Sequence, residues 1–226
     1  MISEADFAAL TVTFRLAAVS TLILLLLGLP LAWWLARSRW RLKFLLEALI
    51  AMPLVLPPTV LGFYLLLMLG PQGPVGGLMD ALGGQSLAFT FEGLVIGSVI
   101  YSLPFVVQPL QNAFAAIGQR PMEVAATLRA GPLDRFLTVA MPLARPGILT
   151  AAALGFAHTV GEFGVVLMIG GNIAGETQVA SIAIYDHVES LSYDNAHGLS
   201  LVLLAISFSL LVVVYAVNRR PRILPT

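Results

Sequence analysis

His158 and Glu162 are the residues of this chain whose types and spacing are most suggestive of chemistry. Residues four apart on an α-helix lie on the same face, so the imidazole and the carboxylate, with Thr159 beside them, are predicted to form a pair. The surrounding sequence is apolar, and an acidic side chain in apolar surroundings usually has a function and a partner. We predict a structural or gating role for Glu162, and direct contact with a ligand or with protons is the alternative.

Other groups that do chemistry are missing from the sequence. Lys43 is its only lysine, and no glycine-rich loop ending in Lys-Ser or Lys-Thr is present to hold nucleotide phosphates. The three histidines, His158, His187 and His197, lack metal-ligand spacing, and the chain contains no cysteine. Neither a Gly-x-Ser-x-Gly nor a His-Glu-x-x-His motif occurs. We therefore predict that the chain is not an enzyme and holds no metal or cofactor of its own.

The elements that position these residues are predicted to be membrane-spanning helices. Of the 226 residues, 58% are hydrophobic and 11% are charged, whereas a soluble domain carries about 25% charged residues. Several apolar runs exceed the ~20 residues that cross the hydrocarbon core of a bilayer. We predict an all-α membrane protein, a helical bundle that forms one domain over residues 1–226. The five predicted spans cover about residues 8–36, 42–69, 91–117, 142–169 and 196–218.

Positive charge is segregated along the chain. Eleven of the twelve lysines and arginines lie within residues 37–43, 120–145 and 219–222. The positive-inside rule makes these segments cytoplasmic, which places the N-terminus outside and the C-terminus in the cytoplasm. Residues 70–89 and 170–195 then form external loops. Within the second loop, residues 178–190 are predicted to form a short surface helix that does not cross the membrane.

Paired prolines interrupt the second predicted span. Pro57 and Pro58, followed by Thr59, remove backbone donors and therefore kink or break a helix. One interpretation is a bend that shapes a gate, and the other is a static kink packed by its neighbours. The sequence leaves both open.

The third predicted span carries a polar stripe. At 100° per residue its polar side chains fall within about a third of the helix circumference. These side chains are Ser98, Tyr101, Ser102, Gln108 and Asn112. Polar groups do not face lipid without reason, so we predict that they line a translocation pathway. Polar packing between helices is the alternative. The residues that we assign to a pathway or gate are Pro57, Pro58, Thr59, Ser98, Ser102, Gln108, His158, Thr159 and Glu162.

Residues 119–141 form a basic, helix-favouring island between two apolar runs. A short cytoplasmic helix can dock in a groove of a soluble partner and transmit a rigid-body rotation. Ala125 and Ala126 permit close approach, and Glu123 and Arg129 can pair with charges of the partner. The alternative is an ordinary solvated loop with capped helices.

This island resembles the cytoplasmic motif of type I ABC importer permeases. The motif has Glu-Ala-Ala, a Gly six residues after the Glu, and an apolar residue-x-Leu-Pro near its end. Glu123-Val124-Ala125 stands at the start, and Val139, Met141 and Pro142 stand near the end with the required spacing.

Arg129 departs from that motif, because it occupies the position where Gly is expected, and Gly131 follows two residues later. The departure favours a shift of the turn between two short helices toward Gly131. The residues predicted to couple the chain to an ATPase are Glu123, Val124, Ala125, Ala126, Arg129, Gly131 and Pro142.

Two further segments, Pro53–Gly70 and Gly161–Gln178, are similar to the molybdate-type oxyanion permeases. The resemblance implies the type I ABC importer permease fold, with five transmembrane helices, cytoplasmic coupling helices and a short external helix, in the cell inner membrane. It also implies a homodimer, two ATPase subunits that carry ATP and magnesium, and a periplasmic or extracellular oxyanion-binding protein. Membrane lipid is a further expected partner, and nucleic acid is not.

The function implied by the resemblance is import of an oxyanion, preferably molybdate, by alternating access that partner ATPases drive. Sulfate and tungstate stay open as substrates, because nothing in the spans reads the size of the anion. A self-sufficient secondary transporter is the less favoured alternative, because the sequence shows neither inverted repeats nor a dense array of membrane-embedded charges.

Four acidic residues of the predicted external loops are candidates for docking the binding protein. They are Asp80, Glu176, Asp186 and Glu189. Carboxylates on the outer surface can pair with lysines and arginines of such a partner. Simple solvation of these four side chains is the alternative.

Overall fold

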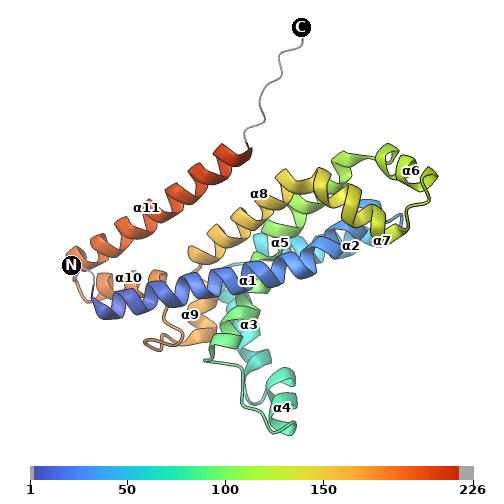
Figure 1. Cartoon of the computed structure of the whole chain (residues 1–226). Coiled ribbons are helices and arrows are strands. Elements are labelled where there is room, and N and C mark those ends of the chain that lie inside the picture. Colours follow the sequence, from blue (N-terminus) through green and yellow to red (C-terminus); the bar gives the residue numbers. More distant parts are fainter. Residues whose placement is uncertain (1–2, 219–226) are drawn as a thin grey trace.

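A long first helix organises the fold, which the computed structural model describes for residues 3–218. α1 (Glu4–Arg37) runs along the bundle (Figure 1). It begins in a capping box, in which Ser3 Oγ accepts the Asp6 N–H at 3.1 Å and Asp6 Oδ2 accepts the Ser3 N–H at 2.9 Å. α1 packs against α5 (Phe91–Ile117) and α8 (Met141–Val160), so these three helices form the centre of the molecule.

The main core lies between these three helices. Its fully buried side chains include Leu24 and Leu35 of α1, Val106, Val107 and Leu110 of α5, and Ala151 of α8. Glycine lets α5 and α8 approach closely, because a Cβ on Gly155 would lie 2.5 Å from Val106 Cγ2. Close contact through small residues is a usual way for helices to associate in lipid.

The second predicted span is divided. α2 (Lys43–Ala51) continues into a 3₁₀ turn (Met52–Leu54), and a new helix, α3 (Pro58–Leu69), begins after Pro57. Pro57 is extended, with φ −55° and ψ 135°, and neither Pro57 nor Pro58 has an N–H for a continuous helix. The residues 42–69 therefore form two helices. The adjoining residues 70–89, expected as a loop, contain the helix α4 (Pro74–Ala81).

The fourth predicted span also differs from one continuous helix over 142–169. α8 ends at Val160, residues 161–163 are non-helical, and α9 (Gly164–Gly170) follows. At its other end α8 extends backward through a π-helical turn (Phe136–Ala140) into α7 (Pro132–Arg135). The end of the island at residues 119–141 is thus continuous with the membrane helix, and its first part is the separate helix α6 (Arg120–Thr127).

α10 (Ala180–Glu189) and α11 (Tyr193–Asn218) complete the described chain. The short helix expected at 178–190 is present, and it is fastened to α1: Thr13 Oγ1 accepts the Ala180 N–H at 2.8 Å, and His187 Nε2 lies 2.7 Å from Asp6 Oδ1. α11 diverges from the rest of the bundle (Figure 1). The third basic segment, which is predicted to be cytoplasmic, lies outside the described residues. It contains Arg219, Arg220 and Arg222.

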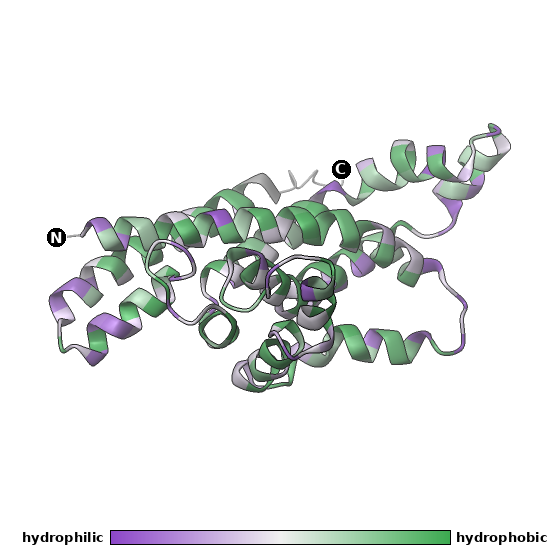
Figure 2. Ribbon diagram, turned by 90° about the horizontal axis from the view of Figure 1, so that it is seen from below, coloured by the Kyte–Doolittle hydropathy of each residue, from purple (hydrophilic) through white to green (hydrophobic). Residues whose placement is uncertain are grey.

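Five helical stretches in the described range are long and apolar enough to cross a membrane, which is the predicted number, although the second and fourth differ from the predicted bounds 42–69 and 142–169. They are Glu4–Arg37, Pro58–Ala81, Phe91–Ile117, Pro132–Val160 and Tyr193–Ala216. Figure 2 shows that these helices are mostly hydrophobic, while hydrophilic segments gather near the ends of the molecule. The prediction of an all-α membrane protein with five spans is confirmed.

Candidate functional site

The break between α8 and α9 places a carboxyl group inside the bundle. Glu162 is 4% exposed, and its Oε2 accepts a hydrogen bond from Ser98 Oγ of α5 at 2.9 Å. Its Oε1 is buried without a hydrogen-bond partner. The backbone carbonyl of Glu162, freed by the break, accepts from Ser181 Oγ of α10 at 2.5 Å. Glu162 thus ties three elements together and keeps one oxygen unmatched.

His158 has its own set of partners. Its Nδ1 lies 2.9 Å from Ser102 Oγ, which is also 3.1 Å from Thr159 Oγ1. The His158 ring stacks on the Phe105 ring, with the two centroids 3.8 Å apart. The Tyr101 ring is tilted against the His158 ring, with their centroids 4.8 Å apart. Tyr101 belongs to the predicted polar stripe. The Phe105 ring and the Ser181 hydroxyl were not predicted, because their roles depend on contacts between helices distant in the sequence.

The predicted His158–Glu162 pair is wrong. The ion pairs in the described part of the chain are Lys43–Glu47 and His187–Asp6, and the hydrogen bonds of His158 and Glu162 go to different serines of α5. The spacing of four residues implies a shared face only while the helix continues, and α8 ends at Val160.

A pocket of about 540 Å³ brings several predicted gate residues together. It is lined by Pro58 and Thr59 of α3, Tyr101 of α5, and His158 and Glu162 around the α8–α9 break. The two interrupted segments touch here, since a Cβ on Gly164 would lie 2.7 Å from Pro58 Cβ. Pro57 is exposed beside this pocket, at the N-cap of α3.

The polar stripe of α5 divides into two parts. Ser98 and Ser102 are fully buried and hold Glu162 and His158, whereas Gln108 and Asn112 are exposed on this single chain. The two serines therefore pack polar groups between helices, which is the alternative explanation, whereas a translocation pathway along the exposed amides stays a prediction.

The island at 119–141 has the geometry of a capped helix followed by a tight turn. α6 ends in a Schellman motif, in which Ala130 N–H donates to the Ala125 carbonyl at 3.1 Å and Arg129 N–H donates to that of Ala126 at 3.0 Å. Arg129 is left-handed, with φ 61°, while Gly131 has φ −70°. The expected shift of the turn toward Gly131 is wrong, because the left-handed residue stays at the position where the motif has Gly.

α6 presents one face to the bundle and another outward. Met122 and Ala125 are buried, whereas Glu123, Val124 and Ala126 are exposed. Pro142 is exposed at the start of α8.

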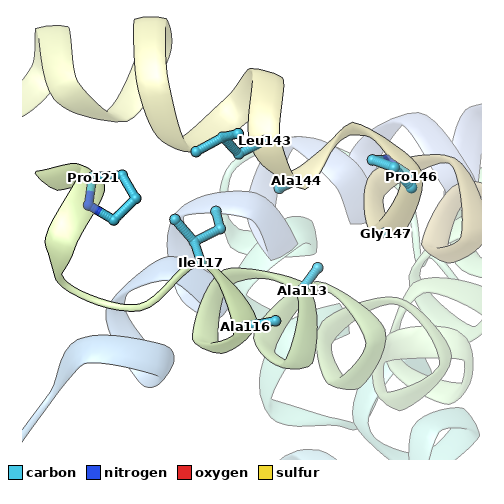
Figure 3. Close-up of a pocket in the computed structure, with 8 residues that line it drawn as sticks. All are labelled: Ala113, Ala116, Ile117, Pro121, Leu143, Ala144, Pro146 and Gly147. Carbon is cyan, nitrogen blue, oxygen red and sulfur yellow. The ribbon is translucent and has the colours of Figure 1, made fainter. Parts of the chain in front are cut away.

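Behind α6 lies an apolar pocket of about 450 Å³, in which Pro121 of α6 faces Ile117 of α5 and Leu143 of α8 (Figure 3). The helix therefore touches the bundle along a narrow face and leaves most of its surface open.

The four candidate docking residues differ in their surroundings. Asp80 and Glu176 are exposed. Asp186 is half-buried, and its Oδ2 accepts from Asn172 Nδ2 and Gln178 Nε2, both at 2.9 Å. The Tyr185 hydroxyl donates to Glu189 Oε1 at 2.6 Å, and this bond raises the pKa of Tyr185. Asp186 and Glu189 thus have partners within the chain, and Asp80 and Glu176 remain the freer candidates.

The arrangement of the helices defines the class of protein. A solved bacterial ABC transporter involved in the import of the acidic polysaccharide alginate aligns with a TM-score of 0.80, over 97% of this chain and 81% of that chain, at 18% identity. An inward-facing structure of the MetNI methionine ABC transporter aligns with a TM-score of 0.66, over 96% of this chain and 100% of that chain, at 18% identity. The chain has the fold of a type I ABC importer permease.

The sequence comparison is more specific. The family model described as "Binding-protein-dependent transport system inner membrane component" matches residues 28–222. The chain belongs to this family of multi-pass inner-membrane transport proteins. The molybdenum transport system permease protein ModB of Azotobacter vinelandii is 61% identical to it over 218 residues, which cover 96% of each chain.

Proposed function

We propose that the chain is the permease subunit of an ATP-driven importer and forms the pathway for an oxyanion, and that this oxyanion is molybdate. The observation that carries this proposal is the 61% identity to a molybdenum transport permease over 96% of the chain. The ATPase is a separate subunit, since this sequence lacks a phosphate-binding loop. A further separate protein delivers the substrate. Membership of this family does not favour the alternative that the chain imports its substrate alone, as a secondary transporter.

The proposed assembly contains two copies of this chain, two ATPase subunits with ATP and magnesium, and an external oxyanion-binding protein. The N-terminus lies outside and the C-terminus in the cytoplasm, because the basic segments are cytoplasmic. Asp80 and Glu176, which are exposed, face the binding protein, and α6 faces the ATPase.

The proposed coupling follows from the shape of the island. The exposed face of α6, with Glu123, Val124 and Ala126, enters a groove of the ATPase. Because α7 continues through the π-helical turn into α8, a displacement at the island is transmitted along a helix that reaches the α8–α9 break. Glu162 and the pocket lined by Thr59 and His158 lie at that break.

The proposed gate is the pair of interrupted segments. α3 begins after Pro57 and α9 begins after Phe163, and the starts of the two helices touch through Pro58 and Gly164. Interrupted helices change direction with few backbone hydrogen bonds to break, which suits a segment that opens and closes.

Uptake by the reconstituted assembly tests both the substrate and the coupling. Vesicles that hold this chain, its ATPase and its binding protein are expected to take up molybdate with ATP, and tungstate or sulfate in excess ranks the competing anions. Glu123→Arg reverses an exposed charge on α6, and we expect at least a tenfold loss of uptake and of ATPase co-purification. The matched control is Asp194→Arg, also exposed but at the start of α11.

Two results would contradict the proposal. Uptake by this chain without an ATPase would favour a secondary transporter. Preferential uptake of sulfate, with molybdate as a weak competitor, would overturn the assigned substrate while leaving the class of transporter intact.

A further inference from the structure

The ends of α1 and α5 enclose a polar pocket that shares no lining residue with the pocket of Thr59, His158 and Glu162. This pocket has a volume of about 400 Å³. Its lining includes Arg37, Ser38 and Arg39 at the end of α1, and Phe114, Gly118 and Gln119 at the end of α5. Arg37 Nη2 donates to the Gly118 carbonyl at 3.4 Å, which joins the two helix ends across the pocket.

Positive charge at this pocket has no matching carboxylate. The Arg37 guanidinium is held over the Trp33 ring, 4.0 Å from its centroid. Arg135 of α7 is close enough to repel Arg37 electrostatically. The ion pairs of residues 3–218 involve neither arginine, nor Arg39. A concave site with clustered guanidinium groups and no acidic side chain in its lining is suited to a phosphate or another oxyanion.

The pocket also has donors that are suited to an oxyanion. Ser38 Oγ accepts the Trp40 N–H at 3.2 Å, and its own hydroxyl proton remains available for a ligand in the described structure. The amide group of Gln119 supplies two further N–H donors at the rim. Arginine, hydroxyl and amide donors together are a usual set for a phosphate group.

Aromatic side chains mark the depth of the pocket in the membrane. Trp34 and Trp40 are 43% and 51% exposed, and their rings lie 6.1 Å apart beside the arginines. Exposed tryptophans gather at the level of lipid headgroups. Basic pockets between helices on the cytoplasmic side bind the headgroups of anionic lipids. A pocket at the depth of the headgroups favours a lipid as the source of the phosphate.

We propose that the pocket of Arg37, Ser38, Arg39 and Gln119 binds the headgroup phosphate of an anionic phospholipid of the cytoplasmic leaflet. The phosphate neutralises the repulsion between Arg37 and Arg135, and its acyl chains lie along the outer surface of α1 beside Trp34. The bound lipid fixes the end of α1 to Gly118. Gly118 directly precedes Gln119, which is the N-cap residue of α6. This proposal rests on the cytoplasmic placement of the basic segments under the proposed function.

The test uses the assembled transporter in nanodiscs. Phosphatidylglycerol is titrated into phosphatidylcholine nanodiscs, and lipid retained after transfer to detergent is counted by native mass spectrometry. We expect the double variant Arg37→Gln and Arg39→Gln to bind phosphatidylglycerol about 25-fold more weakly, since each arginine near an anionic headgroup contributes about fivefold. Arg145→Gln is the matched control, because Arg145 is a basic residue of the same predicted side that lies outside this pocket.

A second arm separates the sources of the phosphate. Inorganic phosphate and molybdate are added to the same protein in pure phosphatidylcholine, and thermal stabilisation is measured. If either free anion stabilises the wild-type protein and does not stabilise the double variant, the pocket binds a soluble oxyanion and the lipid assignment is overturned. Equal phosphatidylglycerol retention by wild type and double variant would also overturn it. Arg39→Gln alone, which leaves the Trp33 stack and the Gly118 contact intact, is expected to show a fivefold loss if the double variant fails to fold.

Molybdate uptake is measured in parallel with these variants. Normal uptake with lost lipid retention supports the lipid site and leaves the proposed transport function in place. Lipid retention is also compared between the permease alone and the permease with its ATPase. If the permease alone retains phosphatidylglycerol and loses it when the ATPase binds, the pocket is an ATPase contact and the lipid site is overturned.

Discussion

Glu162 is the residue whose environment is hardest to satisfy. One of its carboxyl oxygens receives the Ser98 hydroxyl, and the other is buried without a partner. A buried polar group that loses its hydrogen bond costs about 1–3 kcal/mol, and more when it is charged. The Ser98 hydroxyl is therefore important to the stability of the α8–α9 break, and the unmatched Oε1 makes that break the part of the bundle most sensitive to further loss.

Ser98→Ala is expected to lower the free energy of unfolding by about 1–3 kcal/mol, because both oxygens of Glu162 then lack partners. Ser102→Ala is the matched variant on the same helix, and its cost is expected to be smaller. Thr159 still donates to the Gly155 carbonyl at 3.0 Å, and the half-buried His158 can reach water in the pocket. Thermal unfolding in detergent micelles measures the difference.

A double variant separates the lost hydrogen bond from lost packing. Adding Glu162→Met to Ser98→Ala removes both polar partners, and stability is expected to recover, since a pair of apolar groups of similar shape is nearly neutral. If Ser102→Ala destabilised the protein as much as Ser98→Ala, the unmatched carboxylate would not be the cause.

At the scale of elements, the sequence predicts where helices are apolar better than where they break. α5 has the bounds predicted for its span, because Thr90 caps its start and Gly118 follows its end. The break before α3 also has a local cause, the two prolines at 57 and 58. The break at residues 161–163 contains no proline, and the Glu162 carbonyl that it frees accepts a hydrogen bond from Ser181 of another helix. Such tertiary partners carry no local sequence signal.

The end of α6 shows a second limit of local patterns. A glycine two residues away was expected to take the turn, but the Schellman hydrogen bonds of Ala130 and Arg129 fix which residue is left-handed. Leu191 repeats the arrangement after α10, with φ 59°. The motif position determines the conformation at both sites, although neither residue is glycine.

Arg129→Gly is expected to stabilise the end of α6, since a left-handed conformation costs a residue with a Cβ about 1 kcal/mol. Amides of α6 that exchange through fraying of this end should then exchange about fivefold more slowly, as hydrogen–deuterium exchange measures. Arg129→Ala removes the same charge but keeps the Cβ, and it should show no such gain. Equal protection in the two variants would mean that the turn holds no strain.

At the scale of the whole molecule, function depends on the two ends of the bundle being on opposite sides of the membrane. The basic island with α6 lies at one end of α1, and α10, fastened to Asp6 and Thr13, lies at the other (Figure 1). The five apolar stretches that separate these ends are predictable from composition alone. Which end is cytoplasmic follows from the charge rule and stays a prediction.

Single cysteines can test this orientation directly, because the chain contains none. Leu82 after α4 and Leu128 after α6 are matched positions: each is a helix C-cap, and they are 75% and 78% exposed. In right-side-out vesicles, a membrane-impermeant maleimide is expected to label Leu82→Cys at once and Leu128→Cys only after permeabilisation. Because the exposed face of α6 is the proposed ATPase contact, added ATPase should further slow labelling of Leu128→Cys by at least about tenfold, a change equivalent to about 1.4 kcal/mol of protection. Labelling of Leu128→Cys from outside would invert the bundle and remove α6 from reach of any cytoplasmic ATPase.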